Sequence, residues 1–337
     1  MATRMRVITD NDYCGDPDGL VQLAHLLLSP SVDVRAIIGS HLREGDSYNE
    51  GDTGTRSQAA ADTIVELAGL DGRVQTYAGS NTALADRLTP ARSAGVDVIV
   101  AEAMAESEAT LYVLLGGGLT ELASAYLEEP RIADRLIAVW IGGPEYPGVV
   151  APPAGPEGAE VSEYNLKIDI AAAQVVFDSP IQLWQVPRDA YRQALVSFPE
   201  LEVRMRPHGP LGRHLVAELA RVPDELARFG VPASEAYVLG DSPLVLLTAL
   251  QCTYSPDPSS SRYVTRPAPR IRDDGAYEEN PVGRPIRVYD QLDVRLMMED
   301  LFAKLALHAR GPGQVLPTGA PTRRQSQADE AKGTHQG

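Results

Sequence analysis

The chain has 337 residues, enough to bury a substantial core and to form one large α/β domain or two smaller ones. Its composition, with 44% hydrophobic and 23% charged residues, is that of a globular protein. The net charge is −16 and no run of Lys or Arg is longer than two, which argues against a basic surface for nucleic acid or anionic membranes.

No apolar run approaches the ~18 residues that a membrane-spanning helix needs, and the N-terminus has no apolar signal-peptide region. We therefore expect a cytoplasmic protein. The two cysteines, Cys14 and Cys252, form no pattern typical of a secreted disulfide framework. Two reduced thiols are favoured over one disulfide.

The first elements predict a strand, a turn, a helix and a second strand. Residues 7–9 are apolar and β-branched, as in a buried central strand. Asp16 and Pro17 suit a helix cap and the first helical position, and leucines at helical spacing follow. Residues 32–39 predict the next strand. This order favours a right-handed parallel unit.

The alternation of helices and strands continues along the chain. Helices are predicted at 55–70, 96–107, 119–127, 168–177, 211–222, near 242 and at 292–308, and strands at 74–79, 110–115, 136–141, 181–186 and 284–289. Residues 146–160 are rich in Pro, Gly and Ala and are expected to form a loop. The pattern predicts an α/β fold, with a mostly parallel central sheet flanked by helices. We expect one domain over residues 1–310 and a disordered tail over 311–337.

Four aspartates fall within nine residues directly after the first strand: Asp10, Asp12, Asp16 and Asp18. Like charges this close repel each other unless something positive lies among them. Carboxylates suit Ca²⁺ or Mg²⁺, and open α/β sheets place ligands at such strand ends. The alternative is that these residues only form turns and cap a helix. We interpret the cluster as the candidate active site.

Five segments, in the same order, resemble the nucleoside N-ribohydrolases. Residues 7–16 resemble the family's strand-end Asp-Thr-Asp followed by paired aspartates. Residues 113–123 resemble its Gly-Pro-Leu-Thr-Asn-Ile-Ala segment, and residues 140–143 its Met-Gly-Gly strand end. Residues 163–169 resemble its Glu-Phe-Asn segment, and residues 240–244 its His-Asp-Pro-Leu segment. The resemblance implies a Rossmann-like nucleoside-hydrolase architecture.

The resemblance also implies roles for individual residues. Asp12 would bind Ca²⁺ and act as the base for the attacking water, with Asp10 supporting the metal site. The remaining ligands would be Asp18, Asp241 and the carbonyl of Gly116. The sugar would contact Asp16, Glu163 and Asn165. The implied reaction is hydrolysis of a nucleoside N-glycosidic bond through an oxocarbenium-like transition state, in a homodimer or homotetramer.

The chain departs from the family pattern at two positions. Pro17 stands where the second paired aspartate, a metal ligand, is expected, and Asp18 is the candidate replacement. Gly240 stands where many members carry a histidine that protonates or orients the leaving base. His41, at the end of the second predicted strand, is our candidate for that catalytic role, and the alternative is a histidine that only caps the strand end.

Two other functions compete with this prediction. A haloacid-dehalogenase-like phosphatase would use Asp10 as nucleophile and Asp12 as acid and base, but it leaves Asp16, Asp18 and Glu163 without a role. A relative that binds nucleosides or ribose without turnover is favoured by the departures at Pro17 and Gly240. The presence of Asp12 argues against pure binding, because binding alone requires no base.

Overall fold

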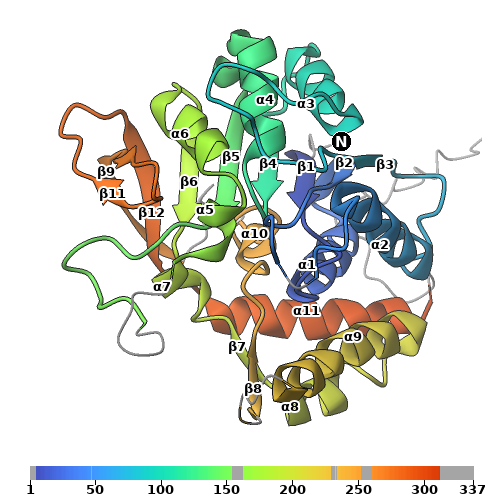
Figure 1. The fold of residues 1–337 in the computed structure, drawn as a ribbon. Helices are drawn as coiled ribbons and strands as arrows, with labels where there is room; N and C mark the ends of the chain where they lie inside the picture. Colours follow the sequence, from blue (N-terminus) through green and yellow to red (C-terminus); the bar gives the residue numbers. More distant parts are fainter. Residues whose placement is uncertain are drawn as a thin grey trace, which may run out of the picture.

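The computed structural model describes residues 5–46, 48–153, 162–228, 232, 234–251 and 260–311. At its centre lies an eight-stranded sheet of order β3-β2-β1-β4-β5-β6-β12-β9 (Figure 1). All neighbouring strands are parallel except β9, which pairs with β12 antiparallel. The strands are β1 (Met5–Asn11), β2 (Val32–Gly39), β3 (Thr76–Ala78), β4 (Leu111–Leu115), β5 (Leu136–Ile141), β6 (Gln182–Val186), β9 (Arg262–Pro267) and β12 (Pro285–Gln291). The predicted fold class is confirmed.

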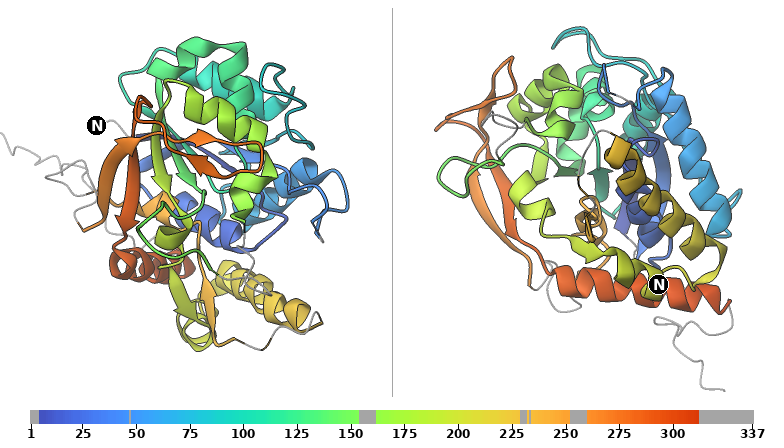
Figure 2. Two further views of the ribbon diagram at one scale, coloured as in Figure 1. Left: turned by 60° about the vertical axis from the view of Figure 1, so that its left-hand side comes forward. Right: turned by 60° about the horizontal axis from the view of Figure 1, so that its bottom comes forward.

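Helices cover both faces of the sheet because alternate side chains of each buried strand point to opposite sides. Val7 and Leu114 belong to one core cluster, and Ile8 and Val113 belong to the other. The first core is covered by α1 (Asp18–Leu27), α2 (Thr53–Leu67), α9 (Gly209–Arg228), α10 (Pro243–Leu246) and α11 (Val294–Ala309). The second is covered by α3 (Ala94–Met104), α4 (Thr120–Glu128), the 3₁₀ helix η1 (Pro130–Asp134) and α6 (Ile170–Asp178). Figures 1 and 2 show the two helical layers.

Several short elements lie outside this framework. They are the helices α5 (Tyr164–Ile168), α7 (Arg188–Tyr191) and α8 (Phe198–Arg204) and the strands β7 (Leu195–Ser197), β8 (Ala236–Val238), β10 (Arg270–Ile271) and β11 (Tyr277–Glu278). β7 pairs with β8, and β10 with β11, both antiparallel. The sequence did not predict these strands, or the edge strand β9, because they are short or largely exposed and lack a buried apolar run.

Two of the differences between the predicted and observed boundaries have a local physical reason. The helix expected from residue 168 is two helices, because Asp169 interrupts the first and caps the second by accepting a hydrogen bond from the backbone N–H of Ala172. α1 begins at Asp18, with Pro17 in the cap position, so the expected cap at Asp16 is wrong. Asp16 instead faces a cavity.

Some predictions fall outside the described part of the chain. The expected disordered tail, apart from Gly311, and Cys252 lie there, as do residues 154–160 of the expected loop. Cys14 is a free thiol. Within the described residues, no helix combines the length and the apolar character that crossing a membrane requires.

The sheet order places a topological switch point between β1 and β4. From β1 the chain proceeds to β2 and β3 on one side, and then crosses to β4, β5 and β6 on the other. The loops that follow β1 and β4 therefore diverge at the carboxyl ends of neighbouring strands. Open α/β sheets bind ligands in the crevice between such loops.

Candidate active site

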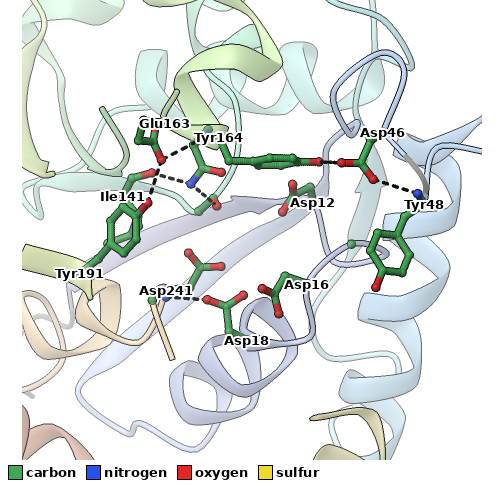
Figure 3. Close-up of a pocket in the computed structure, with 14 residues that line it drawn as sticks. Asp12, Asp16, Asp18, Asp46, Tyr48, Ile141, Glu163, Tyr164, Tyr191 and Asp241 are labelled. Carbon is green, nitrogen blue, oxygen red and sulfur yellow. Dashed lines mark hydrogen bonds between the residues drawn. The ribbon is translucent and has the colours of Figure 1, made fainter. Parts of the chain in front are cut away.

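A cavity of ≈ 250 Å³ lies at this switch point (Figure 3). Its lining comes from the ends of five parallel strands and the segments that follow them, and from the segment before α10. The lining residues are Asp12, Gly15, Asp16, Asp18, Asp46, Tyr48, Gly116, Ile141, Glu163, Tyr164, Asn165, Tyr191, Gly240 and Asp241. Seven of the nine predicted site residues are among them.

The floor of the cavity consists of carboxyl groups from distant parts of the chain. Asp12 directly follows β1, and Asp18 begins α1. The side chain of Asp18 accepts a hydrogen bond from the backbone N–H of Asp241 (3.1 Å). The side-chain amide of Asn11 donates to the carboxylate of Asp241 (2.8 Å). These contacts join residues more than 200 positions apart.

Burial and mutual repulsion weaken the acidity of these groups. Burial raises the pKa of Asp12 well above its usual value, and the charges of Asp241 and Asp16 raise it further. The pKa of Asp18 is raised well above its usual value by burial and then by Asp241, Asp16 and Asp12. The pKa of Asp241 is raised to about 7 and that of Asp16 to about 6, with burial as the first cause in both. These carboxyl groups therefore hold protons more tightly than ordinary aspartates do, and a cation could take the place of those protons.

The sequence left open whether Asp18 replaces the carboxylate that is missing at Pro17. Pro17 does not line the cavity, whereas Asp18 does, next to Asp16 and Asp241 (Figure 3). The intervening proline thus moves the second carboxylate by one residue in the sequence while keeping it in the cavity.

Gly116 fits between Asn11 and Asn165. A Cβ atom at Gly116 would lie 2.2 Å from the Asn11 amide nitrogen, so this close approach requires glycine. The carbonyl of Gly116 accepts a hydrogen bond from the Asn165 amide (3.0 Å), which also donates to the carbonyl of Ile141 (2.7 Å). Both amide hydrogens of Asn165 are therefore used within the protein.

Glu163 is buried and held by donors from three directions. It caps α5, accepting from the backbone N–H groups of Asn165 and Leu166, and it also accepts from the N–H of Gly143. The hydroxyl of Tyr191 donates to it as well (3.1 Å). Burial raises the pKa of Glu163, whereas these hydrogen bonds oppose that shift. Its carboxylate is consequently fixed in position.

Asp46, Tyr48, Tyr164 and Tyr191 complete the cavity and were not predicted as site residues. The hydroxyl of Tyr164 donates to Asp46 (2.9 Å), which also accepts from the backbone N–H of Tyr48 (2.8 Å). Asp46 and Tyr48 lie beyond the end of β2. Because ligands bind at the carboxyl ends of parallel strands, polar residues after this strand were also candidates for the site. Tyr191 carries no local signal, because it belongs to a short helix.

Asp10 and His41 are predicted site residues that the structure places outside the cavity. Asp10 is 1% exposed and lies within β1, close to Glu121 and Ser40. His41 is 2% exposed and does not reach the cavity. The expectation that the end of the second strand would bring His41 to the rim is wrong, because its ring turns toward α4.

His41 is held by hydrogen bonds at both ring nitrogens. Nε2 lies 3.0 Å from the hydroxyl of Thr120, which itself donates to Asp169 (2.8 Å). Nδ1 lies 3.0 Å from the carbonyl of Leu42. His41 also opposes the increase that burial causes in the pKa of Glu121. Both ring nitrogens are therefore used within the scaffold.

The donor chemistry of the cavity floor fits a hard divalent cation, although the side chains do not enclose one as they stand. Among the described residues, no three Asp, Glu, His or Cys side chains form a group that could hold a metal. Nevertheless, Asp241 raises the pKa of both Asp12 and Asp18, and these three carboxyl groups together with the Gly116 carbonyl offer only oxygen ligands.

A doubly wound sheet with an acidic cavity at its switch point defines an α/β protein that binds a small polar ligand. Residues 7–267 match the family described as inosine-uridine preferring nucleoside hydrolase. The chain belongs to this family.

Individual relatives are more distant. The chain is 34% identical over 108 residues to an inosine-uridine preferring nucleoside hydrolase of Crithidia fasciculata, and 34% identical over 115 residues to one of Leishmania major. These matches span 32% and 34% of the relatives' lengths. A purine-preferring ribonucleoside hydrolase from Gardnerella vaginalis has the same fold, with a TM-score of 0.68 at 18% identity, covering 90% of this chain and 99% of that one.

We predict that His41 stabilises the fold. Replacing it in His41→Leu leaves the Thr120 hydroxyl and the Leu42 carbonyl without their buried hydrogen-bond partner, at a cost of about 1–3 kcal/mol. Urea denaturation would measure this loss. The matched variant His208→Leu changes a half-exposed histidine and should cost less than about 0.5 kcal/mol. Equal losses in the two variants would contradict the prediction.

Proposed function

We propose that this protein hydrolyses the N-glycosidic bond of a nucleoside or a related riboside. The observation that carries the proposal is the convergence of Asp12, Asp16, Asp18, Asp241 and the Glu163-Asn165 pair on one cavity. These are the residues to which the family resemblance assigns catalysis, metal binding and sugar binding. Membership of the nucleoside hydrolase family supports the same reaction.

Asp12 is the proposed general base. It lies at the cavity floor, 8% exposed, and its raised pKa makes it a stronger base than an ordinary aspartate. It would take a proton from the water that attacks the anomeric carbon. Charge at the floor would also stabilise the positive charge that develops on the sugar ring in an oxocarbenium-like transition state.

The sugar contacts are proposed from the free acceptors of the cavity. Asp16 lines the cavity beside Asp12 and accepts ribose hydroxyls. Because both amide hydrogens of Asn165 are bound by backbone carbonyls, its carbonyl oxygen is left to accept another hydroxyl. Glu163 fixes the segment that carries Asn165 and lies at the same wall. We expect a ribose with free hydroxyls to be required.

Calcium is the proposed cofactor, held by Asp12, Asp18, Asp241 and the carbonyl of Gly116. A divalent cation there would neutralise the repelling carboxylates and lower the pKa of a water molecule. Asp10 is not included, because it does not line the cavity. We also retain, as proposals from the resemblance, a homodimer or homotetramer and a cytoplasmic location.

The competing functions have less support in the geometry. The phosphatase requires Asp10 as an accessible nucleophile, and Asp10 is 1% exposed within β1. A binding-only relative would use the same cavity, so turnover alone separates it from an enzyme. Release of reducing sugar from a panel of nucleosides in the presence of calcium tests the proposal. Tight nucleoside binding without release from any of them would overturn it.

We predict that Asp12→Asn lowers kcat by at least about 100-fold, because the amide cannot accept a proton from water. Reducing-sugar release under saturating substrate measures this loss, and circular dichroism checks the fold. The matched variant Asp33→Asn, on the half-buried part of β2 far from the cavity, should retain wild-type turnover. Turnover close to wild type in Asp12→Asn would refute the assignment of the base.

We predict that the metal-free protein loses stability as the pH rises from 5.5 to 8. The pKa values of Asp16 (about 6) and Asp241 (about 7) are higher in the folded than in the unfolded state. The folded state therefore holds protons that the unfolded state has already released, and this advantage disappears above pH 7.

Calcium should restore the stability at pH 8 because it replaces those protons as the positive charge at the floor. Thermal melts with chelator and with calcium measure both effects. Asp241→Asn should reduce the pH dependence and the calcium response. A calcium response that this variant retains in full would place the cation elsewhere.

A further inference from the structure

The described part of the cavity lining contains carboxyl groups and phenols but no basic side chain. Among the lining residues in the described part of the chain are six carboxyl groups and three tyrosines, and there is no Lys, Arg or His. The guanidinium of Arg43 contacts the ring of Tyr164 at 5.6 Å from its centroid, but Arg43 is exposed and does not line the cavity. The leaving base therefore meets an acceptor-rich wall.

Each of the three tyrosines has already donated its single hydroxyl proton. Tyr48 donates to Glu225 (2.5 Å), Tyr164 to Asp46 and Tyr191 to Glu163. Burial and these carboxylates raise the pKa of all three phenols, that of Tyr48 to about 12. The hydroxyl groups thus present lone pairs, not protons, to a ligand.

The other polar groups at the cavity walls are acceptors too. Asp46 accepts two hydrogen bonds and Glu163 accepts four. Gly240 contributes no side chain, and a Cβ there would already lie 3.2 Å from Asp18 and 3.4 Å from the ring of Tyr191. Among the described lining residues, no histidine or other basic side chain takes the place of the missing histidine.

This arrangement suits a base that needs no proton in order to leave. When the C–N bond of a neutral nucleoside breaks, its electron pair makes the base an anion, which must be protonated. When the base is already a cation, the same electron pair neutralises it. Water supplies hydroxide to the anomeric carbon, and its proton goes to Asp12. No oxidant, reductant or external acid is required.

We propose, resting on the proposed function, that the preferred substrates are ribosides of cationic heteroaromatic bases, such as N-ribosylpyridinium compounds. Tyr48, Tyr164 and Tyr191 line the cavity (Figure 3). The faces of aromatic rings attract cations. Asp46 adds a carboxylate at that rim. The absence of Lys, Arg and His from the described lining and the presence of acceptors at its walls favour the same class of base.

The test compares ribosides that differ in leaving-group chemistry, using the full chain with calcium. Nicotinamide riboside is the cationic probe, and uridine and inosine are the neutral ones. p-Nitrophenyl riboside is an activated, uncharged control whose phenolate leaves without protonation. Since general acid catalysis contributes about 10²–10⁴-fold, we expect kcat/KM for nicotinamide riboside to exceed that for uridine and inosine by at least ~100-fold.

The outcomes distinguish the proposed hydrolysis from the proposed preference for cationic bases. No sugar release from any riboside, p-nitrophenyl riboside included, would overturn the proposed function. Release from p-nitrophenyl riboside together with equal or faster hydrolysis of uridine or inosine than of nicotinamide riboside would overturn only the cation preference.

A pair of variants tests the recognition of positive charge. Asp46→Asn should lower the ratio of kcat/KM for nicotinamide riboside to that for p-nitrophenyl riboside by about 3–10-fold, as expected for a partly exposed charge pair. Glu44→Gln removes the same charge two residues away, from an exposed side chain outside the cavity, and should leave the ratio unchanged. An equal ratio in all three proteins would overturn the role of Asp46 and the charge recognition.

Discussion

The repulsion among the buried carboxyl groups of the cavity floor is the constraint on which this molecule depends. Asp12, Asp18 and Asp241 each pay a desolvation cost, and the charge of Asp241 raises the pKa of the other two. They are nevertheless held together because Asn11 donates to Asp241 and the backbone of Asp241 donates to Asp18. The sheet order brings these residues together from opposite ends of the chain, although their charges repel each other. Such a cluster indicates a site for a positively charged ligand.

The carboxyl groups at the cavity walls, in contrast, are held by donors of the protein itself. Hydrogen bonds from tyrosines and backbone N–H groups satisfy Asp46 and Glu163. His41 lies behind the site, among Thr120, Asp169 and Glu121. The fold thus uses His41 in the scaffold and leaves the described cavity lining without a basic side chain. A ligand entering this cavity meets its acceptors directly.

Much of the fold was predictable because buried parallel strands have apolar runs and lie between amphipathic helices. Val113 and Leu114, for instance, face opposite cores from one apolar strand, and the sequence predicts that strand without further information. The edge strand β9 was missed because its residues are mainly exposed. The start of α1 was misplaced by one residue because local cap preferences cannot show that Asp16 faces a cavity.

The site was partly predictable for a different reason. Asp12 and Asp16 follow a buried strand and could be chosen locally, whereas Asp241 needed the family resemblance, because nothing near residue 241 shows that Asn11 will contact it. Asp46 was missed because one acidic residue in a polar loop has no distinctive pattern. His41 was expected at the rim because strand ends share one edge of the sheet, but that argument fixes the backbone and not the direction of a side chain. The direction of this side chain matters for function, because the ring of His41 turns inward to α4. The loop after β2 contributes Asp46 and Tyr48 to the cavity instead. These residues provide hydrogen-bond acceptors and an aromatic surface where a proton donor was expected.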